Sequence, residues 1–176
     1  MVLISISVLR QTNDGELIRF KQAGSQEGSI DVSGSTVSLS GFVGIHESSG
    51  VDTSTDKGTV VSSIDELDTY LSGSKIGQDR IDHPKVKISD SVGDTRVLGV
   101  LAGLTESDGK LKVAGLGVGS IKVTGACNGG DLLESNGDGT AKVQDDDVIR
   151  SKTIGKVTIG NSDVNVKLVS CILYCG

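Results

Sequence analysis

Aromatic side chains are scarce in this sequence. Among its 176 residues there is no Trp, and the aromatic residues are Phe20, Phe42, Tyr70 and Tyr174. A surface that stacks nucleic-acid bases or sugar rings needs aromatic faces, so the composition argues against a platform for single-stranded nucleic acid or carbohydrate. The net charge of −6 also disfavours binding to phosphate backbones, which requires clustered Lys and Arg. We therefore expect no nucleic-acid partner.

Long apolar runs are also missing. No stretch approaches the roughly 18 consecutive apolar residues that a membrane-spanning helix needs. The first residues, MVLISISVLRQ, lack the basic region and the small-residue cleavage site of a signal peptide. The sequence therefore predicts a protein that has no membrane partner and is assembled in a cytosol.

The cysteines do not form a recognisable framework. Cys127, Cys171 and Cys175 are odd in number and contain no CxxC pair. If Cys171 and Cys175 lie on one strand, roughly 13 Å separates them, beyond the limit of about 7 Å between the Cα atoms of a disulfide. No ligand spacing matches the four N or S ligands of a zinc site. We interpret all three as small buried or half-buried thiols.

Glycine and small β-forming residues are abundant. The 25 Gly and single Pro, with many Ser, Thr and Val, are typical of short strands joined by tight turns. Roughly ten short strands at spacings of about 8 to 12 residues predict a mainly β fold, an antiparallel sandwich or barrel. We expect one domain over residues 1–176. Residues 1–40 supply N-terminal hairpin strands, residues 41–58 a mobile or contact loop, and residues 59–176 the main β core.

The N-terminal hairpin is expected to join residues 2–8 to residues 16–21 around an Asn-Asp-Gly turn. Several glycines lie inside expected strands, at positions 99, 103, 115, 117 and 119. They predict bulges or close backbone approach, which a neighbouring subunit could provide. The Gly-Leu-Gly-Val-Gly run at 115–119 is not a dinucleotide-binding fingerprint, because no helix pattern follows it.

One short helix is predicted over residues 63–72. Ser63 and Glu66 have the spacing of a capping box, and Gly73 suits a C-terminal cap. A stripe at helical spacing, formed by Ile64, Leu67, Tyr70 and Leu71, is expected to pack on the sheet.

The stretch from residue 129 to 157 predicts a hairpin, because Asn136-Gly137-Asp138-Gly139 accepts the positive φ angles of a tight strand reversal. Its acidic residues leave two further interpretations open. Glu134, Asn136, Asp138, Gly139 and Asp145 approximate the spacing of a calcium loop, although strand-like flanks favour a solvated turn.

The second interpretation concerns a run of three acidic residues, Asp145, Asp146 and Asp147, as candidate acid and base carboxylates. Adjacent residues on a strand point in alternate directions, so they do not face each other across a substrate. A turn that pairs with Arg150 or Lys152 is the preferred interpretation.

Two segments resemble a known group of proteins. Residues 15–38, GELIRFKQAGSQEGSIDVSGSTVS, followed by GFVGIH at 41–46, resemble the start of the self-cleaving intramolecular-chaperone domains that end tail-fibre and neck-appendage proteins of tailed bacteriophages. Residues 123–158 are similar to virion structural proteins of tailed phages, including those that infect cyanobacteria. Together the two similarities cover most of the chain except residues 45–85.

This resemblance implies a homotrimeric, β-rich structural protein of a virion, of the tail-fibre or neck-appendage type, whose partners are copies of itself and other virion proteins. A capsid decoration (cement) protein is the alternative within the structural class. Receptor binding at a fibre tip is a third possibility, which the scarcity of aromatics disfavours for glycans.

The resemblance also raises self-cleavage, the enzymatic alternative. Such a reaction needs a nucleophile beside its own peptide bond and a base that activates it. Ser29 with Glu27 or Asp31, and His46 with Glu47, are the candidates, although an outward strand residue and a loop residue explain Ser29 and His46 equally simply. The Ser-Asp junction before an Arg-Leu-Lys element, present in one branch of these chaperones, is absent. We therefore expect no enzyme activity, catalytic residue, metal or cofactor.

If the chain is a non-cleaving relative, the purified protein should retain its full length. Intact mass spectrometry after prolonged incubation should give one species with the mass of the whole sequence. Two stable fragments whose masses sum to that of the chain plus one water would instead establish self-cleavage.

Overall fold

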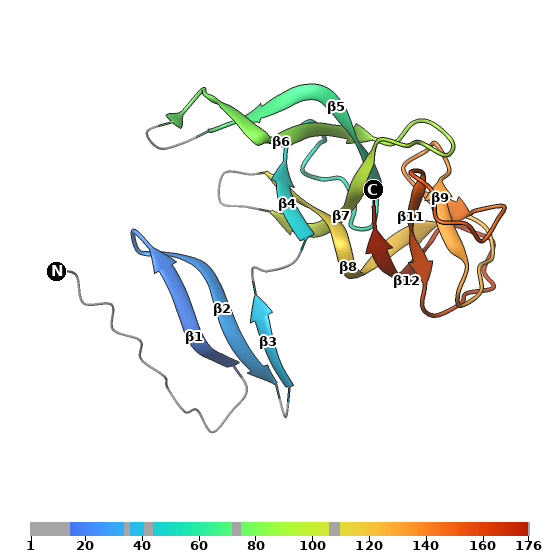
Figure 1. Cartoon of the computed structure of the whole chain (residues 1–176), viewed down its shortest axis with the longest axis horizontal. Coiled ribbons are helices and arrows are strands. Elements are labelled where there is room, and N and C mark those ends of the chain that lie inside the picture. Colours follow the sequence, from blue (N-terminus) through green and yellow to red (C-terminus); the bar gives the residue numbers. More distant parts are fainter. Residues whose placement is uncertain (1–14, 34–35, 41–43, 72–74, 106–109, 176) are drawn as a thin grey trace. The chain divides into compact units, whose positions relative to one another are not determined.

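Strands dominate the computed structural model, which describes residues 15–33, 36–40, 44–71, 75–105 and 110–175 (Figure 1). The prediction of a mainly β protein is confirmed. Contacts within the chain divide it into two compact units, Met1–Val43 and Gly44–Gly176, where the sequence analysis expects one domain. Among the described residues, no helix has the length and apolarity needed to cross a membrane.

The N-terminal unit contains a three-stranded antiparallel sheet in the order β1-β2-β3. Its strands are β1 (Gly15–Gln22), β2 (Ser25–Ser33) and β3 (Thr36–Ser40). Ala23 and Gly24 connect the first two strands with φ angles of 48° and 89°, as a two-residue turn of the hairpin type requires. β1 therefore pairs with the strand that follows it. The partner predicted for it, residues 2–8, lies outside the described residues.

The C-terminal unit contains a single mixed sheet, in which one pairing is parallel and the others are antiparallel. Its strands are β4 (Gly44–Ser48), β5 (Val60–Thr69), β6 (Asp79–Ile88), β7 (Val97–Thr105), β8 (Leu111–Val123), β9 (Leu132–Ser135), β10 (Ala141–Val143), β11 (Thr153–Val157) and β12 (Lys167–Tyr174). They follow the order β10-β9-β11-β12-β8-β7-β5-β6, and β4 also pairs with β8. The parallel pair between Ala141 of β10 and Val123 of β8 closes strands β8 to β12 into a small barrel.

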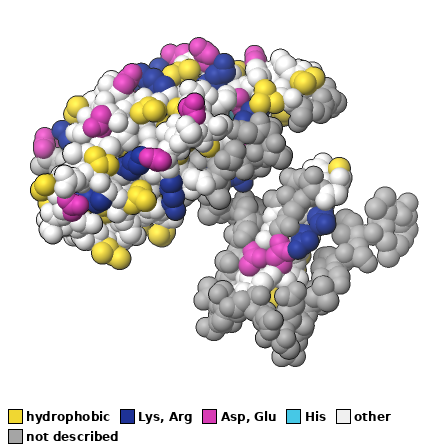
Figure 2. Space-filling model, turned by 180° about the vertical axis from the view of Figure 1, so that it is seen from behind, with side chains coloured by type: hydrophobic (Ala, Val, Ile, Leu, Met, Phe, Trp, Pro, Cys, Tyr) yellow, Lys and Arg dark blue, Asp and Glu magenta, His cyan; other side chains and the backbone are white. Residues whose placement is uncertain are grey.

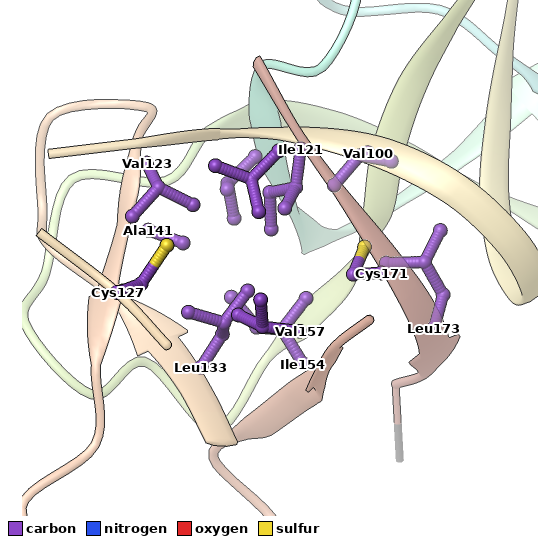
Figure 3. Packing of buried hydrophobic residues seen from close by; sticks show 12 residues of the cluster. Val100, Ile121, Val123, Cys127, Leu133, Ala141, Ile154, Val157, Cys171 and Leu173 are labelled. Atoms are coloured by element: carbon purple, nitrogen blue, oxygen red, sulfur yellow. The ribbon is translucent and has the colours of Figure 1, made fainter. Parts of the chain in front are cut away.

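The barrel encloses the larger hydrophobic core. Figure 3 shows side chains from its strands, together with Val100 and Cys127, directed toward a common centre. The members of this core are all buried: Val60, Val100, Ile121, Val123, Cys127, Leu133, Ala141, Ile154, Val157, Val169, Cys171 and Leu173. Small branched side chains fill a narrow barrel without aromatic mass, which explains how a sequence with so few aromatics builds a core.

A second core lies between β8 and the strands on its other side. It consists of Val61, Val86, Leu101, Leu111 and Val113. β8 contributes to both cores from its two ends, with Leu111 and Val113 in the second core and Ile121 and Val123 in the barrel core.

Glycines occupy the positions of β8 between its two buried segments. Gly117 has a φ of 106°, and a Cβ on Gly115 would lie 2.8 Å from the carbonyl oxygen of Leu98. The predicted close backbone approach is therefore confirmed, and here it occurs within one chain.

The predicted helix over residues 63–72 is wrong. The described part of this segment continues β5 as far as Thr69. A bulge places Ser63 opposite Val86 and Leu67 opposite Pro84, so that the capping-box residues lie in an irregular strand. An isolated helix of about ten residues is marginal in water, whereas pairing with β6 satisfies the backbone over a longer range. The expected apolar stripe is not buried, since Leu67 is 38% and Leu71 51% exposed.

Part of the predicted loop over residues 41–58 is also a strand. β4 pairs with β8 from Gly44 opposite Leu116 to Ser48 opposite Leu111. The amide of Val86 donates to the carbonyl of Ser49 over 2.9 Å, which joins the end of β4 to β6. Residues 41–43 lie outside the described residues.

Gly155 offers a test of the barrel, because β11 and β12 approach closely there. A Cβ at this position would lie 2.3 Å from the carbonyl oxygen of Ile172. Gly155→Ala should therefore lower the free energy of unfolding by about 2 kcal/mol or more. Gly129→Ala is the matched control, since its Cβ would meet its nearest neighbour, the Thr158 carbonyl, at 3.4 Å. Equal urea midpoints for the two variants would contradict the barrel geometry.

Candidate functional site

The residues considered for self-cleavage lie in two different compact units of the chain. Ser29 on β2 is 4% exposed, and its hydroxyl donates to Asp31 over 2.7 Å. His46 lies on β4, in the other compact unit, and is exposed. Its neighbour Glu47 forms an ion pair with Arg80 at 2.6 Å. The hydroxyl of Ser29 thus has a carboxylate acceptor, and the side chain of Glu27 lies outside the described residues.

The densest group of charged side chains lies where β4, β5, β6 and the start of β8 meet. We call Glu47, Asp68, Arg80, His83 and Lys110 the seam cluster. At its centre, Lys110 Nζ lies 2.6 Å from Asp68 Oδ2, and each side chain is only 2% exposed. A buried ion pair is costly to desolvate, so its stability depends on further hydrogen bonds.

Asp68 has those further bonds. The hydroxyl of Ser49 donates to its Oδ1 over 2.6 Å, and Arg80 Nη1 lies 3.4 Å from its Oδ2. Burial raises the pKa of Asp68, but hydrogen bonds from Lys110 and Ser49 outweigh it and hold the pKa below its usual value. Asp68 is therefore an ionised anchor for three segments of the chain.

Arg80 links the centre of the seam cluster to the histidines. Its Nη2 lies 2.9 Å from His83 Nε2. A guanidinium only donates hydrogen bonds, so the ring nitrogen is the acceptor in this contact. The ring of His83 meets the ring of His46 edge to face at 6.3 Å, and the guanidinium lies 5.3 Å from the centre of the Tyr70 ring. Within the described structure, both histidines of the chain therefore lie at this seam.

The seam cluster contains equal numbers of basic and acidic groups at its centre, Arg80 and Lys110 with Glu47 and Asp68. Ion pairs between these groups connect neighbouring strands, although the buried Nε of Arg80 has no hydrogen-bond partner among the described residues. The sequence analysis did not identify the Asp68–Lys110 pair. The two residues are 42 positions apart, and Asp68 falls in the segment predicted as a helix, so no local pattern connects them.

A second buried polar network joins β5, β6 and β7 to the barrel. Asp94 accepts hydrogen bonds from the hydroxyls of Ser62 at 2.6 Å and Ser89 at 3.2 Å, and Ser89 continues to Ser135 of β9 at 2.7 Å. Burial raises the pKa of Asp94, but the bonds from Ser62 and Ser89 and one from the Arg96 amide lower it by more. The net pKa is below the usual value, so the group remains ionised. This network also has a structural role.

The calcium interpretation of the 134–145 segment finds no support in the described structure. Glu134 is buried and pairs with Lys142 at 3.4 Å and with Lys152. Asp138 accepts hydrogen bonds from the amide and hydroxyl of Thr140 at 3.0 and 2.6 Å. No group of three His, Cys, Asp or Glu side chains among the described residues is arranged to hold a metal. The predicted hairpin is confirmed, with β9 and β10 on either side of the turn.

The three consecutive aspartates lie in the loop between β10 and β11. Asp146 accepts a hydrogen bond from the Val148 amide at 3.0 Å and pairs with Arg150 at 2.9 Å, as the sequence predicts. The same two contacts, in that order, lower the pKa of Asp146. Asp145 and Asp147 are exposed. The run therefore shapes a loop and presents negative charge to solvent.

The interpretation of the cysteines is confirmed. Cys127 and Cys171 are buried, Cys175 is half-buried, and all three are free thiols. Burial raises the pKa of Cys171 to about 11 and that of Cys175 to about 12. Thiols with such pKa values are almost entirely protonated at neutral pH and are poor nucleophiles.

A shallow cavity of about 340 Å³ lies between the 54–59 segment, the β9–β10 turn and Val166. Its basic residue, Lys122, pairs with Asp56 at 2.9 Å, and the carboxylate of Asp138 is bonded to Thr140. These charged groups already have partners in the chain, so the cavity offers little for a charged ligand.

Apolar surface is the other prominent feature. Figure 2 shows hydrophobic side chains spread among charged ones over the visible face of the larger unit. On the outside of the barrel, Leu116 pairs with Tyr174 and Val118 with Ile172 across the β8–β12 ladder. Val118 is 82% and Leu116 62% exposed. Such a contiguous exposed patch indicates an interaction surface.

The N-terminal sheet has a smaller apolar row, formed by the paired residues Ile18 and Ile30. Every hydrophobic side chain described in this unit is partly or largely exposed, including Phe20 at 48%. The adjacent register position carries Glu16 and Asp31. The apolar side chains described on this sheet are therefore not fully buried.

Comparison with known proteins adds no relative: no family model matches the chain, and no curated protein matches it.

The buried pair in the seam cluster leads to a stability prediction. Asp68→Asn removes the buried carboxylate that lies 2.6 Å from Lys110 Nζ and should lower the free energy of unfolding by about 3 kcal/mol at pH 7. The folded pKa of Asp68 lies below its unfolded value, so its contribution is complete above about pH 3.9 and is lost as the pH falls through the folded value. The difference in free energy of unfolding between the variant and the wild type should therefore decrease at acid pH, as measured by urea titration.

Asp65→Asn is the matched control for this measurement. Asp65 pairs with Arg96 at 2.7 Å, but its side chain is 90% exposed. An exposed pair contributes less than about 1 kcal/mol. Similar losses for Asp65→Asn and Asp68→Asn would contradict the anchoring role of the seam cluster.

Proposed function

We propose that this protein is a structural component of a tailed-phage virion, of the tail-fibre or neck-appendage type, which acts by assembling as a homotrimer. One observation carries the proposal. The N-terminal sheet has an apolar face, yet no hydrophobic side chain described in that unit is buried.

A three-stranded sheet needs a covered hydrophobic face to be stable. Complete burial of an Ile or Phe side chain contributes about 1.5–3 kcal/mol, and none of Ile18, Phe20 and Ile30 is completely buried. Association of copies around a common axis covers the same residues in every chain, and closed symmetric assemblies are the usual outcome. The C-terminal unit, with two buried cores, is the part that folds around its own interior.

A structural role also fits the polar groups of the C-terminal unit. The seam cluster and the Asp94 network use their charges to hold strands together. The placement in a virion is supported by the resemblance of residues 15–38 and 123–158 to phage virion proteins. Antibody labelling of purified particles distinguishes a tail or neck position from a capsid position, and absence from the particle would contradict the proposal.

The trimer proposal predicts the mass of the protein in solution. Light scattering after size exclusion should give three times the mass of the chain. Ile18→Asp places a charge in the apolar row and should shift the protein to monomer, while the melting transition of the C-terminal unit stays unchanged. Ile81→Asp is the control, since Ile81 lies on β6 and is 86% exposed. A wild-type monomer at all concentrations would contradict the proposal.

A further inference from the structure

The outer face of the barrel combines apolar and basic character. We define the β8–β12 face as Leu116, Val118, Ile172, Tyr174 and Lys156. The first four are cross-strand pairs of one ladder, and Lys156 of β11 pairs with Ile172. Strands β8, β11 and β12 contain no acidic residue. The face is thus apolar at its centre and positively charged at its edge, in a chain whose net charge is −6.

Lys156 is available for an external partner. It is exposed, and the described residues place no carboxylate within ion-pair distance of it. Lys122, farther along β8, differs because Asp56 lies 2.9 Å away. The edge of the face next to Ile172 therefore carries an unbalanced positive charge.

The loop between β10 and β11 has the opposite character. We define the acidic loop as residues 145–149, Asp-Asp-Asp-Val-Ile. All five are exposed, with Val148 at 49% and Ile149 at 63%. Asp147 has no basic partner among the described residues. The loop therefore places two aliphatic side chains directly beside unpaired negative charge.

The acidic loop also has a fixed shape. Gln144, which is buried, donates from Nε2 to the carbonyl of Val148 at 2.8 Å and to Asp146 Oδ1 at 2.9 Å. The hydroxyl of Thr153 donates to the amide oxygen of Gln144, Oε1, at 2.8 Å. A loop that is already ordered loses little conformational entropy when it docks.

We propose that the acidic loop of one copy docks on the β8–β12 face of the next copy, with Val148 and Ile149 over Val118 and Ile172, and Asp147 near Lys156. This inference rests on the proposed function, since it names a contact between copies of the assembly. Aliphatic groups meet aliphatic groups, and opposite charges meet at the rim, as in specific interfaces.

The charges also decide the symmetry of this contact. Two β8–β12 faces placed against each other would oppose positive edges, and two acidic loops would oppose carboxylates. A contact between the loop of one copy and the face of another avoids both. Because its two sides are different surfaces, repetition of this contact generates a ring when the rotation closes, which agrees with a trimer.

Sedimentation equilibrium of the full-length chain tests the contact by measuring the dissociation constant of assembly. Val118→Asp, at the centre of the face, should raise that constant by about tenfold or more. Ile76→Asp is the matched control, because Ile76 is an aliphatic residue that is 66% exposed in the turn between β5 and β6, and it should leave the constant unchanged.

A charge swap identifies the partner of the face. Lys156→Glu and Asp147→Lys should each raise the dissociation constant by about two- to fivefold, the effect of a partly exposed pair. The double variant should return to within about twofold of wild type, because the pair is rebuilt with reversed sign. Lys75→Glu, an equal change of charge at an exposed site, is the control.

The outcomes separate this inference from the proposed function. A monomeric wild type overturns both. An oligomeric wild type whose dissociation constant is unaffected by Val118→Asp overturns this inference alone. The same holds if the two single charge reversals weaken assembly and the double variant is weaker still, because the acidic loop then does not meet this face.

Discussion

One strand, β8, sets the architecture of the larger unit. The second half of this strand belongs to the barrel with β12 and β10, and its first half lies between β7 and β4. A strand can contribute to two cores only if its backbone bends between them, and Gly117, between the two halves, has a φ of 106°, which favours glycine. A Cβ on Gly115 would lie 2.8 Å from the carbonyl oxygen of Leu98, and one on Gly119 would lie 3.1 Å from a methyl carbon of Leu173.

Buried polar groups supply the specificity that a small aliphatic core lacks. Val, Ile and Leu side chains of similar size pack in many ways, so they determine the register of strands weakly. The Asp68–Lys110 pair and the Asp94 network require particular partners, and an error in register would leave a charge buried alone. These groups connect β4, β5, β6 and β8 on one side, and β5, β7 and β9 on the other.

The surface has the opposite arrangement to the interior. Asp68, Lys110 and Asp94 inside the C-terminal unit have partners within the chain, whereas Leu116 and Val118 on the β8–β12 face are exposed. An enzyme of this size usually concentrates unsatisfied polar groups in a pocket. Here the described cavity is shallow and its charged groups are already paired.

Turn chemistry and composition by themselves determined that this chain is a set of short strands, that residues 136–139 reverse the chain, and that the three cysteines are buried or half-buried thiols. These properties depend on neighbouring residues or on the preference of one residue type, so they can be read locally. Tertiary structure alone decided that residues 63–69 extend β5, that residues 44–48 add a strand to β8, and that Asp68 meets Lys110. In each case the deciding partner is far away in the sequence. Its hydrogen bonds or charge outweigh a local preference of only a few tenths of a kcal/mol per residue.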